Sequence, residues 1–168
     1  MADAAERAGH RSVLRQVARL LALLGFVTGR TSFFVRRREW IAEFVHLHKY
    51  RSGPSYRVHL GIRVLNDVFP AAALNGPDSH AYTCPGNSNG SRYELDFAPP
   101  PRSPERCAAE VARWCVEVGE PWFARFASPE ALLADGSPLD AVAREQLRLA
   151  LTGDSDPARV AASERLLV

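Results

Sequence analysis

The sequence is poor in the features that would point directly to a chemistry. Its 168 residues include three cysteines, one methionine and a single lysine, Lys49. No apolar run approaches the roughly 20 residues that a membrane-spanning helix needs. A glycine-rich phosphate loop, a spaced set of metal ligands and a nucleophile elbow are all missing. The fold therefore has to be inferred before the function.

The cysteines indicate a reducing compartment. Cys84, Cys107 and Cys115 cannot all pair, and no two of them form a Cys-x-x-Cys motif. Cys107 and Cys115 fall within a helical pattern, where cysteine usually acts as a small buried hydrophobe. A catalytic thiol is the alternative, but no histidine lies C-terminal to His80 to activate it. We expect both to be buried.

The apolar N-terminal segment, residues 13–27, is expected to be a surface helix rather than a leader peptide. Arg15 and Arg19 interrupt it, and Asp3 and Glu6 stand where a leader carries positive charge. Together with the thiols, this pattern predicts a cytoplasmic protein with no membrane partner. The abundance of arginine and alanine is typical of a high-GC bacterial genome.

The net charge of +2 hides an asymmetry between the two ends of the chain. Residues 1–103 carry 14 Lys/Arg against 8 Asp/Glu, whereas residues 104–168 carry 7 against 11. The two ends either neutralise each other within one fold or leave a basic surface that faces an acidic partner. The overall charge is too small to indicate a nucleic-acid protein.

Hydrophobic periodicity predicts an amphipathic helix followed by three strands. In residues 13–24 apolar side chains recur at helical spacing, and the following Gly-Phe is typical of a left-handed helix cap. Residues 31–36, 40–50 and 56–65 are rich in β-branched and aromatic residues and are separated by turn sequences. The last of them alternates apolar and polar residues, which predicts an antiparallel sheet with one buried face.

The remainder of the chain predicts a long loop region and then helices. Residues 75–104 are rich in proline, glycine, asparagine and serine, and a fourth strand is expected at residues 93–97. Ser103 and Pro104 are typical of a helix start, and this helix is expected to end at Gly119.

Shorter helices are expected from residues 121, 128 and 137 onward, and a C-terminal turn or helix within residues 153–168. We therefore predict a single α+β domain, residues 1–168, with its core at about residues 12–152. In it, an N-terminal helix packs on a three- to four-stranded, mainly antiparallel sheet, and a C-terminal helical half follows.

The second and third strands predict a face of histidine and arginine. Centring their hairpin on residues 52–53 sets His46 opposite His59 and His48 opposite Arg57. The same register pairs valine with leucine on the other face, so both faces are satisfied at once. The candidate partner-binding residues are Arg36, Trp40, His46, His48, Arg57, His59 and Arg63.

Other chemistries at this face remain as alternatives. Two histidines at i and i+2 with a third opposite could approach a common ion, but Arg57 and Arg63 would repel it, so we expect no metal and no cofactor. The arginines at residues 36–38, close to aromatic residues, could bind nucleic acid, although an arginine-rich turn is ordinarily just solvated. Glu43 shares its strand face with core residues, and we expect it to pair with an arginine rather than to act in acid–base catalysis.

The order of residues resembles that of small, uncharacterised bacterial domains of unknown function, over about residues 12–135. That resemblance implies the fold pattern and no catalytic residue. The position where such sequences commonly carry an amide is here His48. The matching segments are Leu24-Gly25-Phe26, Phe33-Phe34-Val35-Arg36, Trp40, residues 45–49, residues 58–64 and Pro121-Trp122.

These features predict a non-catalytic protein-binding module. Arginine, histidine and aromatic residues on one sheet face have the composition that binding hot spots favour. A small single-domain bacterial protein of this design fits an immunity or antitoxin-type role, in which it blocks a toxin or effector. A small nucleic-acid-binding protein and a metal-binding enzyme that uses the histidine face are the alternatives.

Overall fold

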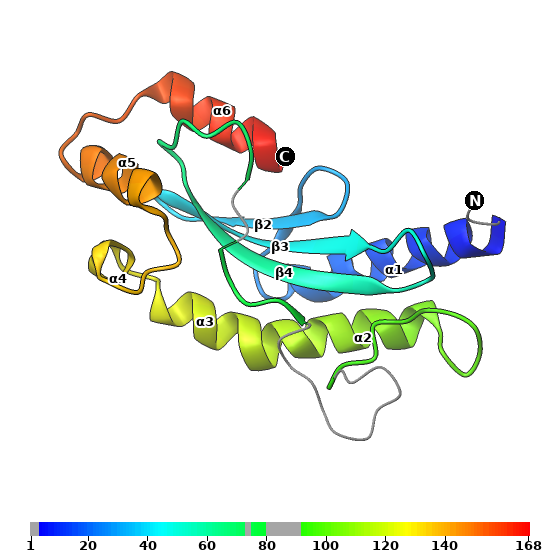
Figure 1. Ribbon diagram of the computed structural model, residues 1–168. Coiled ribbons are helices and arrows are strands. Elements are labelled where there is room, and N and C mark those ends of the chain that lie inside the picture. Colours follow the sequence, from blue (N-terminus) through cyan, green and yellow to red (C-terminus); the bar gives the residue numbers. More distant parts are fainter. Residues whose placement is uncertain (1–3, 73–74, 80–91) are drawn as a thin grey trace.

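The computed structural model describes residues 4–72, 75–79 and 92–168, and it has the expected α+β fold (Figure 1). Four antiparallel strands lie in the order β1-β2-β3-β4, with an N-terminal helix before them and further helices after them. The strands are β1 Val27–Thr28, β2 Phe33–Arg37, β3 Ile41–Lys49 and β4 Tyr56–Val64. Within the described ranges, no helix combines the length and apolarity needed to cross a membrane.

The N-terminal helix α1, Ala4–Ala22, packs on the sheet and ends as the sequence predicts. Its buried stripe consists of Val13, Val17 and Leu21. Gly25 has a φ of 83°, and the N–H of Phe26 donates to the carbonyl of Leu21 at 3.1 Å. This left-handed cap turns Phe26 back into the core, where it is buried.

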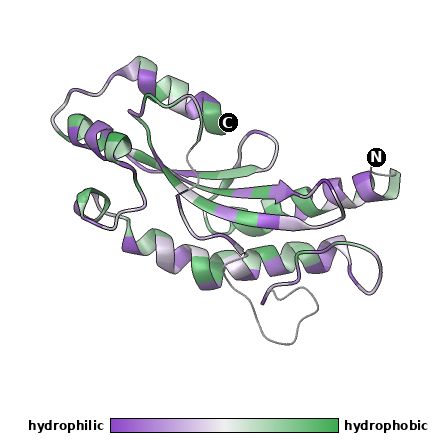
Figure 2. Ribbon diagram, viewed as in Figure 1, coloured by the Kyte–Doolittle hydropathy of each residue, from purple (hydrophilic) through white to green (hydrophobic). Residues whose placement is uncertain are grey.

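The predicted register of β3 and β4 is confirmed. His46 pairs with His59, and His48 pairs with Arg57. Hydrophobic and hydrophilic residues alternate along β4, as the ribbon of Figure 2 shows. One face of the sheet thereby meets the helices and forms the main core. On that face the two strands contribute Ile41, Val45, Leu47, Tyr56, Val58, Leu60, Ile62 and Val64.

Below the sheet in Figure 1, α2 and α3 form one long helical rod. A π-helical turn, Cys115–Gly119, joins α2 Pro104–Trp114 to α3 Glu120–Arg125. The expected helix end at Gly119 is wrong, because Gly119 keeps a helical φ of −67°. Pro121 lacks an N–H and would crowd the carbonyl four residues before it, and the wider turn just before it relieves this crowding.

The expected strand at residues 93–97 is also wrong. Tyr93, Leu95 and Phe97 are buried, as their alternation indicates, but the segment makes only a bridge between Ser55 and Asp96. Its backbone bonds lie at the start of β4, and the prolines at residues 99–101 cannot donate to a longer ladder. The fourth strand of the sheet is instead the short β1, which pairs with β2.

Three further helices complete the chain: α4 Pro129–Leu133, α5 Ala141–Leu151 and α6 Pro157–Leu167. The helix expected from residue 137 begins later, because Asp140 caps it by accepting from the N–H of Ala143 at 2.8 Å. The C-terminal helix, α6, crosses to the opposite face of the sheet (Figure 1). There it covers a second, smaller core of Val35, Ala42, Phe44, Leu65 and Leu167.

Candidate functional site

The helix α6 covers one part of the second face of the sheet, and no helix in the described residues covers the rest. The hairpin end of β3 and β4 extends beyond α6, as Figure 1 shows. We call this part beyond α6 the histidine surface. Its residues come from β2, β3, the turn after β3, and β4: Phe33, His46, His48, Tyr50, Arg57 and His59. His48 is exposed, and the other members are partly buried.

Three rings on this surface stand in a row across three strands. Because β2, β3 and β4 are in register, Phe33, His46 and His59 are direct cross-strand neighbours. The rings of Phe33 and His46 stack with centroids 4.2 Å apart and planes 16° apart. The rings of His46 and His59 follow at 5.9 Å and 20°. The imidazole of His46 therefore lies between two other rings.

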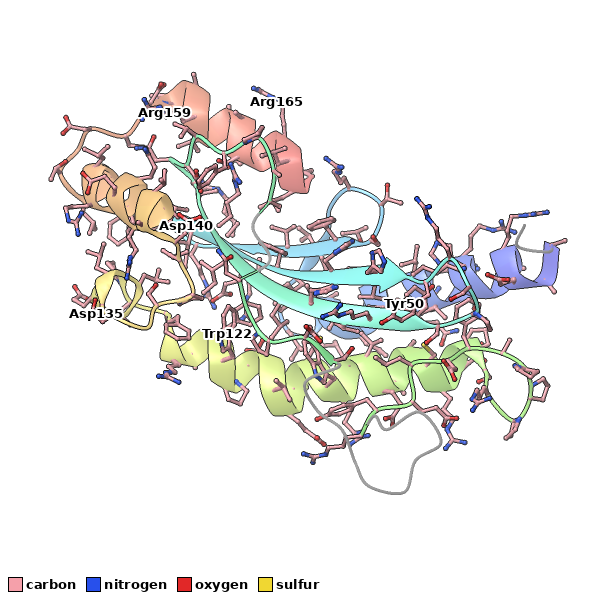
Figure 3. All side chains as sticks on the ribbon, viewed as in Figure 1. Tyr50, Trp122, Asp135, Asp140, Arg159 and Arg165 are labelled. Atoms are coloured by element: carbon pink, nitrogen blue, oxygen red, sulfur yellow. The ribbon has the colours of Figure 1, made fainter. Side chains whose placement is uncertain are left out.

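His48 and Tyr50 extend this row toward the hairpin. The ring of His48 is nearly perpendicular to those of His46 and His59, with centroids 6.2 and 6.3 Å away. Tyr50 meets His48 edge-on at 5.9 Å. Figure 3 shows Tyr50 at the hairpin end of the sheet, away from α6. The result is one continuous aromatic cluster that contains three imidazoles.

The electrostatics of the cluster keep its central imidazole neutral. Burial, the neighbouring histidines and Arg30 together lower the pKa of His46 to about 4. The Nδ1 atom of His46 is buried and has no hydrogen-bond partner in the described parts of the chain. His46 thus acts at neutral pH as a polar but uncharged ring.

One side of the histidine surface is bordered by residues 75–79, which run along the outer edge of β4. The N–H of Leu60 donates to the carbonyl of Pro77 at 3.1 Å, and the N–H of Val58 donates to Ser79 Oγ at 3.0 Å. Asp78 of this segment accepts a hydrogen bond from Arg57 at 2.5 Å. The bond raises the pKa of the Arg57 guanidinium. The segment therefore covers the free edge of β4 and orients Arg57.

The expectation that Arg63 is accessible on this face is wrong. Arg63 has the predicted strand parity, but only 2% of it is exposed. Its guanidinium donates to the carbonyls of Ala71 at 2.7 Å and Phe69 at 2.8 Å. The alternation of residues determines which face a side chain occupies, but it does not show that residues 66–72 fold over this position.

Arg36 and Trp40 also lie away from the histidine surface. Arg36 points to the helix side of the sheet, where its Nε is 2.6 Å from Glu43 Oε2 and its guanidinium also meets Glu120. The expected structural ion pair of Glu43 is thus confirmed. Trp40 packs against the main core. Phe33, at the start of β2, was missed; extending the predicted register by one strand would have placed it beside His46.

The two cysteines that the structure describes lie in the main core, as expected. Cys107 and Cys115 are buried and unpaired. Burial raises the pKa of the Cys107 thiol to about 12 and also raises that of Cys115. Cys84 and His80 lie outside the described residues. Among the residues that the structure places, no group of three His, Cys, Asp or Glu side chains could hold a metal ion.

Comparison with models of protein families, with curated proteins and with solved structures finds no match to this chain. Any functional reading has to come from the geometry itself.

Proposed function

We propose that this protein is a non-catalytic protein-binding module that docks another protein on the histidine surface. The observation that supports this most strongly is the hairpin end of the sheet beyond α6, where an aromatic cluster that includes the exposed His48 lies beside Arg57. Large aromatic rings with an arginine beside them are typical of the centres of protein interfaces.

The rigidity of this surface also favours binding. Its side chains stand on paired strands and are held by ring contacts, and Arg57 is held by Asp78. Ordering them on association costs little entropy, because they are already ordered. Chemical turnover has less support, since both cysteines with a described structure are buried with raised pKa values.

The biological role that we propose is that of an immunity or antitoxin-type protein in the bacterial cytoplasm, which blocks a toxin or effector. This role is consistent with the small size of the chain and with the resemblance to small bacterial domains described above. A partner protein encoded by a neighbouring gene is the first candidate to test.

Site-specific photo-crosslinking tests the proposal. A photoreactive amino acid replaces His48, which is exposed, and a matched control places it at Arg15, an exposed position on α1 on the other side of the sheet. We expect a single protein to crosslink at residue 48 and not at residue 15. Once purified, that protein should bind the wild-type chain. It should bind the His48→Glu variant at least about tenfold more weakly, which corresponds to about 1.4 kcal/mol of binding free energy.

Two results would contradict the proposal. One is the absence of any residue 48-specific crosslink to a protein. The other is a purified partner that binds His48→Glu and Arg15→Glu as tightly as the wild type. A crosslink at residue 48 to nucleic acid alone would favour the alternative of a nucleic-acid-binding protein.

A further inference from the structure

We infer that the histidine surface recognises an acidic segment of its partner, whose carboxylates accept hydrogen bonds from the imidazole edges and whose binding is accompanied by proton uptake. This inference rests on the proposed protein-binding function and specifies the chemistry of the partner. It follows from the orientation of the rings and from the charges that surround them.

The orientation of the rings favours hydrogen bonding over stacking. Phe33, His46 and His59 stack against one another along the sheet, with interplanar angles of 16° and 20°. Rings arranged in this way cover each other's faces, and the exposed ring of His48 stands nearly perpendicular to the two histidines of the row. The edge of an imidazole carries its two nitrogens, which donate hydrogen bonds when protonated. A ligand that reaches the exposed His48 therefore meets a hydrogen-bonding group rather than a free stack of ring faces.

The same orientation argues against single-stranded nucleic acid. Proteins that bind it use exposed ring faces on which the bases stack. Here Phe33 and His59 occupy the two sides of the His46 ring. The central ring of the surface offers no free face to a base.

The charges around the rings favour an anionic partner. Arg57 lies on β4 beside the cluster, and exposed Arg30, in the turn before β2, is close enough to lower the pKa of His46. Arg51, also exposed, follows Tyr50 in the β3–β4 turn. The carboxylate of Asp78 faces the surface as well, but it is already bound by Arg57. A segment rich in Asp or Glu complements this arrangement.

The proximity of the imidazoles makes binding sensitive to protons. With centroids about 6 Å away, a proton on His59 or His48 disfavours a proton on His46. Arg30 and Arg57 add to this repulsion, whereas Asp78 opposes it and Tyr50 is neutral. Docked carboxylates reverse the balance, because they stabilise the charged rings. The complex therefore binds more protons than the free protein does.

Fluorescence anisotropy with three labelled probes tests the inference. The probes are a short peptide of alternating Glu and Ser, the same peptide with Gln in place of Glu, and a short oligothymidylate. We expect the acidic peptide to bind at least about fivefold more tightly at about pH 6 than at about pH 7.5. Each proton taken up on binding raises the affinity by up to about tenfold for each unit by which the pH falls. The Gln peptide should not bind measurably.

Variants distinguish the contribution of the imidazoles to binding from that of the overall positive charge. His48→Gln changes an exposed residue and should keep the fold, and the double variant His48→Gln/His59→Gln should reduce the pH dependence to less than about twofold. Arg15→Gln, on α1, removes one positive charge elsewhere and should leave the pH dependence unchanged.

Three outcomes would overturn the inference: equal binding of the Glu and Gln peptides, binding of the acidic peptide that is independent of pH, or tighter binding of the oligothymidylate. The crosslinking experiment distinguishes such a failure from failure of the proposed function. If a protein partner is crosslinked at residue 48 but the acidic peptide does not compete with it, only the inference about partner chemistry is wrong.

Discussion

Arg36 and Glu43 face each other across β2 and β3 on the helix side of the sheet, with Nε and Oε2 2.6 Å apart. The Glu43 side chain is only 1% exposed, and the Arg36 guanidinium also donates to the carbonyl of Leu24 at 2.7 Å. Burial alone would lower the pKa of Arg36, but the bonds and charges of Glu43 and Glu120 outweigh it, so the pKa is raised. One guanidinium thus links the end of α1, both strands and α3.

Removal of one partner of this pair should be costly. Glu43→Ala leaves Arg36 buried without its closest carboxylate, and we expect a loss of about 3 kcal/mol in the free energy of unfolding. Urea denaturation measures it. The matched control is Arg148→Ala, which breaks the exposed pair with Glu145 and should cost less than about 1 kcal/mol. Equal losses for the two variants would show that the buried pair does not carry the stability that its position suggests.

The sequence was sufficient to predict the β3–β4 register and the surface that depends on it. Only one pairing sets valine against leucine on one face while it sets His46 against His59 on the other. A slip by one residue would exchange the two faces, so burial of one face determines both. The cap at Gly25 was predictable for a similar reason, since a local pattern determines a local geometry.

What covers each face was not predictable from local patterns. Arg63 has the same strand parity as His59, but residues 66–72 fold over it and α6, some hundred residues further along the chain, covers its neighbours. The continuous rod through Gly119 was missed because a π-helical turn leaves no signature in the apolar spacing. Contacts between distant segments, such as that of α6 with the sheet, can be known only once the whole chain is folded.

Arg63 should anchor residues 66–72 to the sheet. Arg63→Met keeps the aliphatic part of the side chain but leaves the carbonyls of Ala71 and Phe69 without their donor. We expect a destabilisation of about 1–3 kcal/mol. The variant should also show a larger increase in the rate of hydrogen exchange in residues 66–72 than in β4. Arg51→Met, at an exposed turn position, is the control and should have no effect on either. Unchanged exchange in residues 66–72 would refute the anchoring role.

Gly29 should determine how closely the end of α6 approaches the sheet. A Cβ at this position would lie 2.0 Å from the carbonyl oxygen of Leu167, which also accepts a hydrogen bond from the N–H of Arg30 at 2.9 Å. Gly29→Ala should therefore displace Leu167 and increase hydrogen exchange in α6, with a loss of about 1–3 kcal/mol. Gly53→Ala is the control, because an added Cβ there meets no atom within 4 Å. Native-like protection of α6 in Gly29→Ala would contradict this contact.

The two buried thiols should be unreactive in the folded protein and should limit its stability at high pH. In a Cys84→Ser background, Cys107 and Cys115 should not react with a thiol reagent at about pH 8 until urea unfolds the chain. Because their folded pKa values are raised, the stability that they contribute is complete below the unfolded pKa of about 8.5 and is lost as the pH rises above it. Reaction of either thiol under native conditions would contradict its burial.

The neutral ring of His46 should make the fold less stable in acid. Its pKa is about 4 in the folded protein, against about 6.5 in the unfolded chain. Below about pH 6.5 the unfolded chain binds a proton that the folded protein does not, so stability falls until the pH reaches about 4 and then levels off. Since solvent screens the half-buried ring, we expect this part of the loss to be about 1–2 kcal/mol.

Urea denaturation of the His46→Gln variant across this pH range tests the prediction. The variant has no proton to bind at residue 46, so it should lose correspondingly less stability than the wild type between these pH values. Arg15→Gln is the matched control, because Arg15 is exposed on α1, on the other side of the sheet, and its profile should follow that of the wild type. If His46→Gln and the wild type lose stability in parallel, the stack of Phe33, His46 and His59 does not hold its central imidazole neutral.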